Sequence, residues 1–110
     1  DGDATGRELH LFLLGICEHE ILSDSIVIDL LYENNICYGA HLIHNNKDKI
    51  IYAHNTIIAS GGVGSIYRYH TNSTTIAGDI QGICLEKGLP LKDMEMMQFH
   101  PTVFVDSPNA

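Results

Sequence analysis

One short stretch, residues 56–64, constrains this chain more than any other. Two β-branched residues, Ile57-Ile58, lead into the small pair Ala59-Ser60, and Gly61-Gly62 then ends the run. This pattern predicts a short strand, buried on both faces, that stops at a tight turn. Glycine accepts positive φ and has no Cβ, so another group can approach the backbone there. Two hypotheses follow: a nucleotide cofactor lies across this stretch, or the strand ends in an ordinary glycine turn.

Composition narrows the class of protein. The 110 residues, 45% hydrophobic and 18% charged, are enough for one small globular unit. A formal net charge of −8 argues against nucleic acid or an acidic membrane surface as partners. No apolar run approaches the roughly 20 residues that span a bilayer. Three scattered cysteines without CxxC spacing indicate reduced thiols in a cytoplasmic protein. Seven histidines lack metal-ligand spacing, so we predict no metal site.

The first half of the chain predicts a helix and a meander. Thr5 and Glu8 fit a capping box, and apolar residues then recur at helical spacing, so we expect a helix from about Gly6 to Glu20. Polar turns at Asn34-Asn35 and at 45–48 separate three β-branched runs. We therefore predict an antiparallel three-stranded meander with these strands: Ile26–Glu33, Cys37–His44 and Lys49–Ala53.

The second half predicts a different arrangement. The strand at 56–60 is more apolar than the meander and is expected in a separate, buried sheet. A helix is expected from about Gly78 to Lys87, because Gly88 suits a helix C-terminus and Pro90 prevents continuation. Alternation over Lys92–Phe99 predicts a last strand. The fold class is therefore α+β: a meander plus part of a second sheet, with flanking helices.

Two groups of polar residues could bind a ligand. Asp79, at the start of the second predicted helix, could accept hydrogen bonds from cofactor hydroxyls or simply stabilise the helix dipole. Gln98, His100 and Thr102 alternate on the last strand and would face one side, where they could bind a carboxylate. The alternative is an ordinary histidine at a strand end, held extended by Pro101. The methionines at 94, 96 and 97 are most simply core residues.

The motifs, taken in order, resemble one flavoprotein superfamily, that of the FAD-dependent succinate dehydrogenases, fumarate reductases and L-aspartate oxidases. The opening Asp3–Arg7 and the Ala59–Gly62 turn are most similar to the L-aspartate oxidase branch. The end of the chain is equally similar to the succinate and fumarate enzymes. The segments that carry the resemblance are Asp3–Arg7, Ala59–Gly64 with Tyr67, Thr71-Asn72, Gly78-Asp79, Asp93–Met96 and Gln98–Thr102.

The resemblance implies a cofactor, a reaction and roles for single residues. FAD would accept a hydride at N5 from a dicarboxylate, giving iminoaspartate in the aspartate case, in the pathway to quinolinate and NAD. His100, Gln98 and Thr102 would face the substrate, with His100 on a carboxylate. Val27 would offer backbone groups to the adenine, and Asn72 would lie near the flavin. The cofactor-binding set implied is Val27, Ala59, Ser60, Gly61, Gly62, Asn72 and Asp79.

The sequence also departs from the superfamily pattern. Ile80-Gln81 follows Asp79 where the family has Gly-Asp-Gly, and no Gly-x-Gly-x-x-Gly motif is present. The family's catalytic arginine would follow Ala110, so no catalytic residue is assigned within the chain. We therefore expect residues 1–110 to be one inner fragment of an α/β parent. It would include the middle of a Rossmann-like FAD-binding domain and the edge of a substrate-capping domain.

Such a fragment is expected to lack catalysis, to bind FAD weakly or not at all, and to self-associate through exposed apolar edges near Ile57–Ala59. One alternative is a flavoprotein subunit of a succinate or fumarate enzyme, which needs iron–sulfur and membrane subunits as partners. Another is a non-catalytic α+β module with a fully covered core.

Overall fold

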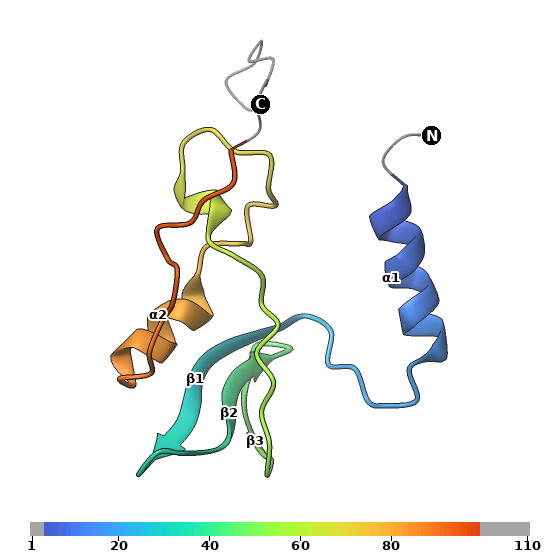
Figure 1. Ribbon diagram of the computed structural model, residues 1–110. Helices are drawn as coiled ribbons and strands as arrows, with labels where there is room; N and C mark the ends of the chain where they lie inside the picture. The colour runs from blue at the N-terminus through green and yellow to red at the C-terminus, as the bar shows by residue number, and fades with distance from the viewer. Residues whose placement is uncertain (1–3, 100–110) are drawn as a thin grey trace.

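A three-stranded antiparallel sheet is the centre of the fold. The computed structural model describes residues 4–99, and its strands are β1 (Ser25–Glu33), β2 (Ile36–His44) and β3 (Lys47–Tyr52). They pair in the order β1-β2-β3, as Figure 1 shows. The predicted meander is confirmed, because alternating apolar residues and polar turns together determine both pairing and register.

Both hairpin turns consist of two asparagines. Asn34 and Asn35 have φ of 50° and 63°, and Asn45 and Asn46 have φ of 51° and 59°. Asparagine tolerates this left-handed region, and two such residues give the turn that matches the twist of a hairpin. The second turn is therefore shorter than the predicted four residues, and β3 begins at Lys47.

A glycine in β2 allows β3 to approach closely. Gly39 is buried, and a Cβ at this position would overlap the carbonyl oxygen of Ile51 on β3. The β1–β2 register is irregular beside it, between Leu31 and Tyr32. A glycine inside a strand commonly marks such a close backbone approach.

The second helix, α2 (Asp79–Glu86), packs against β1. It begins after Gly78, whose φ is 81°, and Gly88 with φ of 74° follows it. The predicted helix is confirmed, and it ends just before Gly88 as the sequence indicated. The buried apolar residues of the described chain lie on β1, β2 and α2: Leu30, Leu42 and Cys84.

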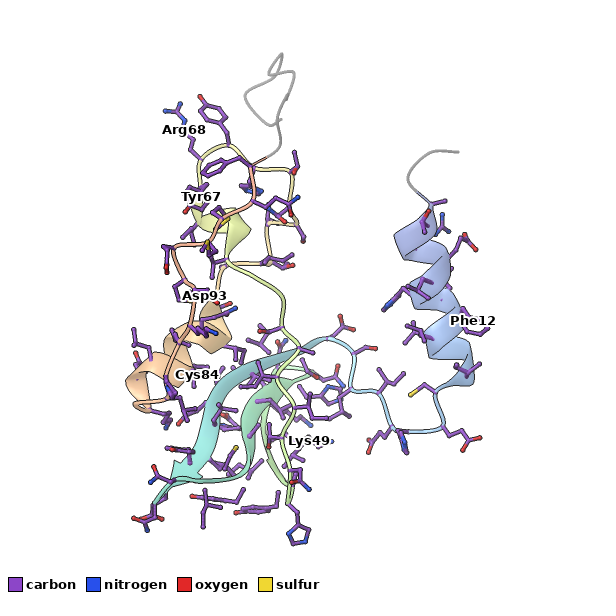
Figure 2. The ribbon with its side chains drawn as sticks, in the orientation of Figure 1. Phe12, Lys49, Tyr67, Arg68, Cys84 and Asp93 are labelled. Carbon is purple, nitrogen blue, oxygen red and sulfur yellow. The ribbon has the colours of Figure 1, made fainter. Side chains whose placement is uncertain are left out.

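The first helix, α1 (Thr5–Ile16), packs against no other element of the described chain. Figure 1 shows it standing apart from the sheet, and Figure 2 shows Phe12 with no segment beside it. Phe12 is 63% exposed, and the helix buries none of its residues. Between residues 4 and 99, no helix combines the length and the apolarity needed to cross a bilayer.

Two details predicted for α1 are wrong. Ala4 is the N-cap and no side chain caps the helix, because Thr5 already lies inside the first turn. The helix also ends at Ile16 and not at Glu20. Glu18 and Glu20 would place negative charge at a helix C-terminus, where the helix dipole disfavours it.

Two predicted strands are also absent from the described structure. Residues 56–60 are irregular, with Ile57 91% exposed, so this stretch is not buried on both faces. Residues 92–99 contain a turn, in which Asp93 has φ of 56° and the Met96 N–H donates to the Asp93 carbonyl oxygen at 3.0 Å. A strand requires a ladder partner, and none among residues 4–99 pairs with either segment. The second sheet therefore does not form in this range.

Candidate cofactor pocket

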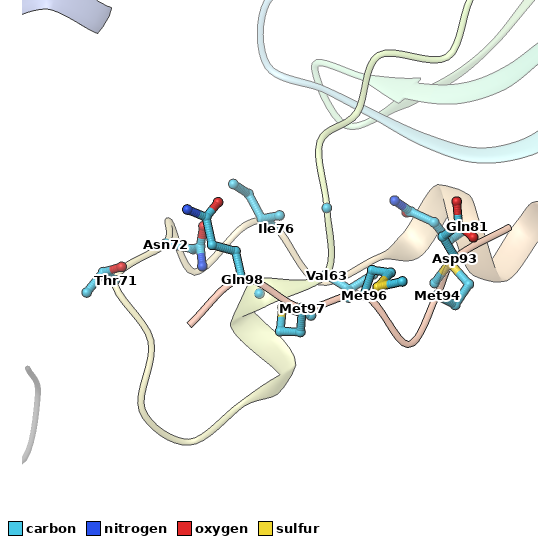
Figure 3. A pocket seen from close by; sticks show the side chains of 12 residues that line it. Val63, Thr71, Asn72, Ile76, Gln81, Asp93, Met94, Met96, Met97 and Gln98 are labelled. Atoms are coloured by element: carbon cyan, nitrogen blue, oxygen red, sulfur yellow. The ribbon is translucent and has the colours of Figure 1, made fainter. Parts of the chain in front are cut away.

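An open pocket of about 480 Å³ lies between the glycine corner, the following loop, α2 and the last described segment. Figure 3 shows Asn72 and Gln98 toward one end and Gln81 and Asp93 toward the other. Its volume falls within the usual range for small-molecule sites. The lining residues are Gly62, Val63, Gly64, Thr71, Asn72, Ile76, Gln81, Asp93, Met94, Met96, Met97 and Gln98.

Hydrogen bonds between distant segments hold the corner of this pocket. The short 3₁₀ helix η1 (Gly64–Ile66) follows the glycines, and the Ser65 N–H donates to the Ile76 carbonyl oxygen at 3.0 Å. The Gln81 side-chain amide donates to the Gly61 carbonyl oxygen at 2.7 Å. These bonds connect the corner to the loop and to α2, so no sheet is needed to fix it.

Close packing adds to these bonds at two further glycines. Gly64 is buried, and a Cβ there would overlap the side-chain amide of Asn72. Gly78 has positive φ, and a Cβ there would crowd the Val63 side chain. Asn72 and Val63 can therefore line the pocket only because glycine occupies the position behind each of them.

The pocket combines an apolar middle with amide groups. Val63, Ile76 and the methionines contribute apolar surface, whereas Asn72, Gln98 and Gln81 carry side-chain amides. Asp93 is the one ionisable residue that lines it, and no lysine or arginine of residues 4–99 does so. Such a wall suits a flat, uncharged heterocycle with polar edges better than it suits a phosphate, which calls for cations or helix N-termini.

Three of the predicted site residues meet in this pocket: Gly62, Asn72 and Gln98. Gly61 lies immediately beside it, with its carbonyl oxygen bonded to Gln81. Ala59 and Ser60 are exposed on the segment that leads into the corner and do not line the pocket.

The remaining predicted site residues lie elsewhere. Asp79 is the exposed first residue of α2, outside the pocket lining. Val27 is half-buried on β1, an edge strand, so part of its backbone is not used by the sheet. His100 and Thr102 lie outside the described residues. The row of side chains predicted with Gln98 therefore stays a prediction, although the strand meant to carry it is absent up to Phe99.

Sequence reasoning missed several members of the pocket. Gln81 was noted only as a departure from the family pattern, yet it bonds the glycine corner. Met94 and Met96 are 45% and 74% exposed, so their interpretation as core residues is wrong. The sequence held part of this information, because methionine is frequent in adaptable binding surfaces as well as in cores.

An ion pair holds α2 to the sheet, away from the pocket. The Lys87 ammonium lies 2.8 Å from the Asp29 carboxylate on β1. This hydrogen bond lowers the pKa of Asp29 below its usual 3.8, against the opposing effect of burial and with smaller help from the Leu30 N–H and the charge of Lys87. Residues 4–99 contain no group of three or more histidine, cysteine, aspartate or glutamate residues arranged to hold a metal ion.

Comparison with known proteins identifies the family to which this chain belongs. The model of the FAD-binding domain family matches residues 2–110. The chain therefore belongs to the FAD-binding domain family, and FAD is the cofactor of that family. No solved structure matches the chain significantly.

Individual relatives include both aspartate and succinate enzymes. The L-aspartate oxidase of Clostridium acetobutylicum is 38% identical over 80% of this chain, and that of Bacillus subtilis is 36% identical over 94%. The succinate dehydrogenase flavoprotein subunit of Rickettsia bellii is 39% identical over 91%. The matched region covers 20% of each oxidase and 18% of the subunit, so the chain spans about a fifth of the length of these relatives.

The chemistry of the pocket lining is compatible with part of an FAD molecule. No atom lies within 4 Å of the place where a Cβ of Gly62 would stand, so a ring can lie against the backbone there. The amides of Asn72 and Gln98 can bond polar edge atoms of an isoalloxazine, and the apolar side chains of the lining can pack against its rings. No lysine or arginine among residues 4–99 lines the pocket to neutralise a pyrophosphate, so the lining suits the flavin end of the cofactor better.

Proposed function

We propose that this chain belongs to an FAD-dependent oxidoreductase that oxidises L-aspartate to iminoaspartate in the cytoplasm, a step toward quinolinate and NAD. One observation carries the proposal: the glycine corner, Asn72 and Gln98, which are far apart in sequence, line the same pocket. The motif resemblance and the family membership of residues 2–110 support it. The parent fold would be α/β, with residues 1–110 between its FAD-binding and substrate-capping parts.

FAD, when bound, supplies the hydride acceptor. The chain's own residues would bind the cofactor and orient it. Gly61 and Gly62, with Ala59 and Ser60 leading into the corner, present backbone to the cofactor. Asn72 orients the flavin end, Asp79 contributes an acceptor, and the Val27 backbone contacts the adenine.

Substrate recognition is proposed for the end of the chain. Gln98 would donate its amide to the dicarboxylate, with His100 binding a carboxylate and Thr102 adding a hydroxyl. A histidine close to a carboxylate gains a charge-assisted hydrogen bond when protonated. One such cation is too few for two carboxylates, so further cationic ligands would come from outside residues 1–110.

The runner-up is a flavoprotein subunit of succinate dehydrogenase or fumarate reductase. It is favoured by the 39% identity to the Rickettsia bellii subunit, about equal to the identity to the aspartate oxidases. A subunit of this kind would require iron–sulfur and membrane subunits as partners. The non-catalytic module has less support, because it requires a covered core and the described residues expose Ile57 and the whole of α1.

The test is a purified protein translated from the complete reading frame. We expect it to hold FAD, and L-aspartate to bleach the visible flavin absorbance without oxygen, with oxygen restoring it. Succinate should leave the flavin oxidised. Bleaching by succinate alone would support the runner-up, and a protein that takes up no FAD would refute both. The chain of residues 1–110 alone is expected to bind FAD weakly and to catalyse nothing.

A further inference from the structure

One polar contact connects α2 to the glycine corner of the pocket. The Gln81 Nε2 donates to the Gly61 carbonyl oxygen at 2.7 Å, across 20 residues of sequence. Both Gln81 and the next corner residue, Gly62, line the pocket. In Figure 3, Gln81 reaches from α2 toward the chain that enters the corner before Val63.

This hydrogen bond also fixes the orientation of the peptide group between Gly61 and Gly62. A trans peptide is planar, so the carbonyl of one residue and the N–H of the next point in opposite directions. The Gly61 carbonyl points at Gln81, and therefore the Gly62 N–H points away from it. No backbone or side-chain acceptor among residues 4–99 pairs with that N–H.

The same peptide can also turn over at little conformational cost. A flip changes ψ of the first residue and φ of the second, and glycine at both positions accepts either sign. Gly61 already has φ of 78°. Without an external hydrogen bond, the corner would therefore populate two orientations, only one of which aims the Gly62 N–H away from α2.

We propose that Gln81 is a positioning residue that selects one orientation of the Gly61–Gly62 peptide and so presents the Gly62 N–H to an acceptor atom of the bound cofactor. This inference rests on the proposed function, because it takes the pocket as the flavin site. Gln81 itself need not touch FAD. Its contribution is to favour one orientation of the peptide before FAD binds. The apparent affinity for FAD then rises in proportion to the fraction of molecules in that orientation.

Two near-isosteric variants test this role in the protein from the complete reading frame. Gln81→Met keeps length and removes the donor, so FAD affinity should fall about three- to tenfold, the range for one lost hydrogen bond. Gln81→Glu replaces the donor with a carboxylate that repels the Gly61 carbonyl and attracts the Gly62 N–H. It favours the flipped peptide, and its loss should be larger than that of Gln81→Met.

Acid should rescue the second variant alone. A protonated carboxyl can donate to the Gly61 carbonyl, so the affinity of Gln81→Glu relative to wild type should recover as pH falls. The charged groups near this position are Asp93, at the same end of the pocket, and Asp79 on the same helix. Both would raise the pKa of the introduced carboxyl, whereas the N-terminus of α2, in whose first turn it lies, would lower it.

The readouts are FAD dissociation constants by fluorescence quenching across pH, the visible spectrum of the bound flavin, and thermal unfolding without FAD. Glu86→Gln, exposed on the same helix, is the control and should keep wild-type affinity. Wild-type affinity in both Gln81 variants would overturn the inference, and so would equal losses without acid rescue, which indicate packing alone. A wild-type protein that binds no FAD would overturn the proposed function itself, which separates the two failures.

Discussion

Adding one methyl group at Gly62 should weaken the binding of FAD and leave the stability of the fold nearly unchanged. Gly62 lines the pocket, is not among the glycines with positive φ, and has no atom within 4 Å of its missing Cβ. Alanine therefore fits the protein without FAD, and the free energy of unfolding should change by no more than about 0.5 kcal/mol. The new methyl instead occupies the space against which the flavin is proposed to lie.

The expected loss of affinity follows from that overlap. Inserting a methyl into a filled site typically costs about 1–3 kcal/mol. Since about 1.4 kcal/mol corresponds to a tenfold change, FAD should bind roughly five- to 150-fold more weakly to Gly62→Ala. Quenching of flavin fluorescence, titrated with protein from the complete reading frame, measures this directly, and thermal unfolding without FAD verifies that the fold is intact.

The matched control lies on α2. Gly82 is exposed, outside the pocket lining, and its missing Cβ also meets no atom within 4 Å. Alanine inside a helix is favoured over glycine, so Gly82→Ala should stabilise the protein by about 0.5–1 kcal/mol and leave FAD affinity unchanged. Wild-type FAD affinity in Gly62→Ala, with normal unfolding, would refute the placement of the cofactor against this corner.

Further predictions concern the sheet and the exposed surface. Gly39→Ala should lower the free energy of unfolding by about 1–3 kcal/mol in urea titrations, because its Cβ would overlap a backbone oxygen of β3. Leu30→Ala, at a position only 4% exposed, should cost about 2–5 kcal/mol in the same titration. The lowered pKa of Asp29 means that its pairing with Lys87 stabilises the fold above pH 3.8 and that this contribution is lost as pH falls through the lower folded-state value. Asp29→Asn should therefore cost less than about 1 kcal/mol at neutral pH, since the carboxylate is 43% exposed, and nothing in strong acid. Phe12→Ser should reduce self-association of residues 1–110 in sedimentation experiments, because this phenylalanine is 63% exposed on an uncovered helix face.

Features set by neighbouring residues could be predicted from the sequence. The asparagine pairs at 34–35 and 45–46 determine both hairpins, because asparagine accepts the left-handed backbone that these turns need. Gly88 and Pro90 likewise gave the C-terminal limit of α2. Each of these signals acts within a few residues, so no knowledge of the rest of the fold was required.

Features that require a distant partner could not be predicted in the same way. Residues 56–60 have the composition of a buried strand. A strand also needs a neighbour to pair with, which the local sequence does not show, and Ile57 is exposed in the structure. Three of the predicted residues line the pocket, and their roles there stay predictions. Gly62 was singled out by the glycine turn, Gln98 by its alternation with His100, and Asn72 by the resemblance to the flavoprotein superfamily. Gln81 was missed as a site residue, since its role depends on a carbonyl 20 residues earlier that only the folded chain brings within 2.7 Å.

The position of α2 connects the stable part of this fold with its candidate site. One end of the helix is held to β1 by Lys87 and Asp29, while its first turn reaches the glycine corner through Gln81. The pocket walls are otherwise irregular segments, which lack a ladder of their own and are the parts of proteins that open most easily. Tilting α2 on β1 would therefore move the Gln81 amide relative to the Gly61 carbonyl. The geometry of the corner depends in this way on packing against the sheet, although none of the strands between residues 4 and 99 lines the pocket.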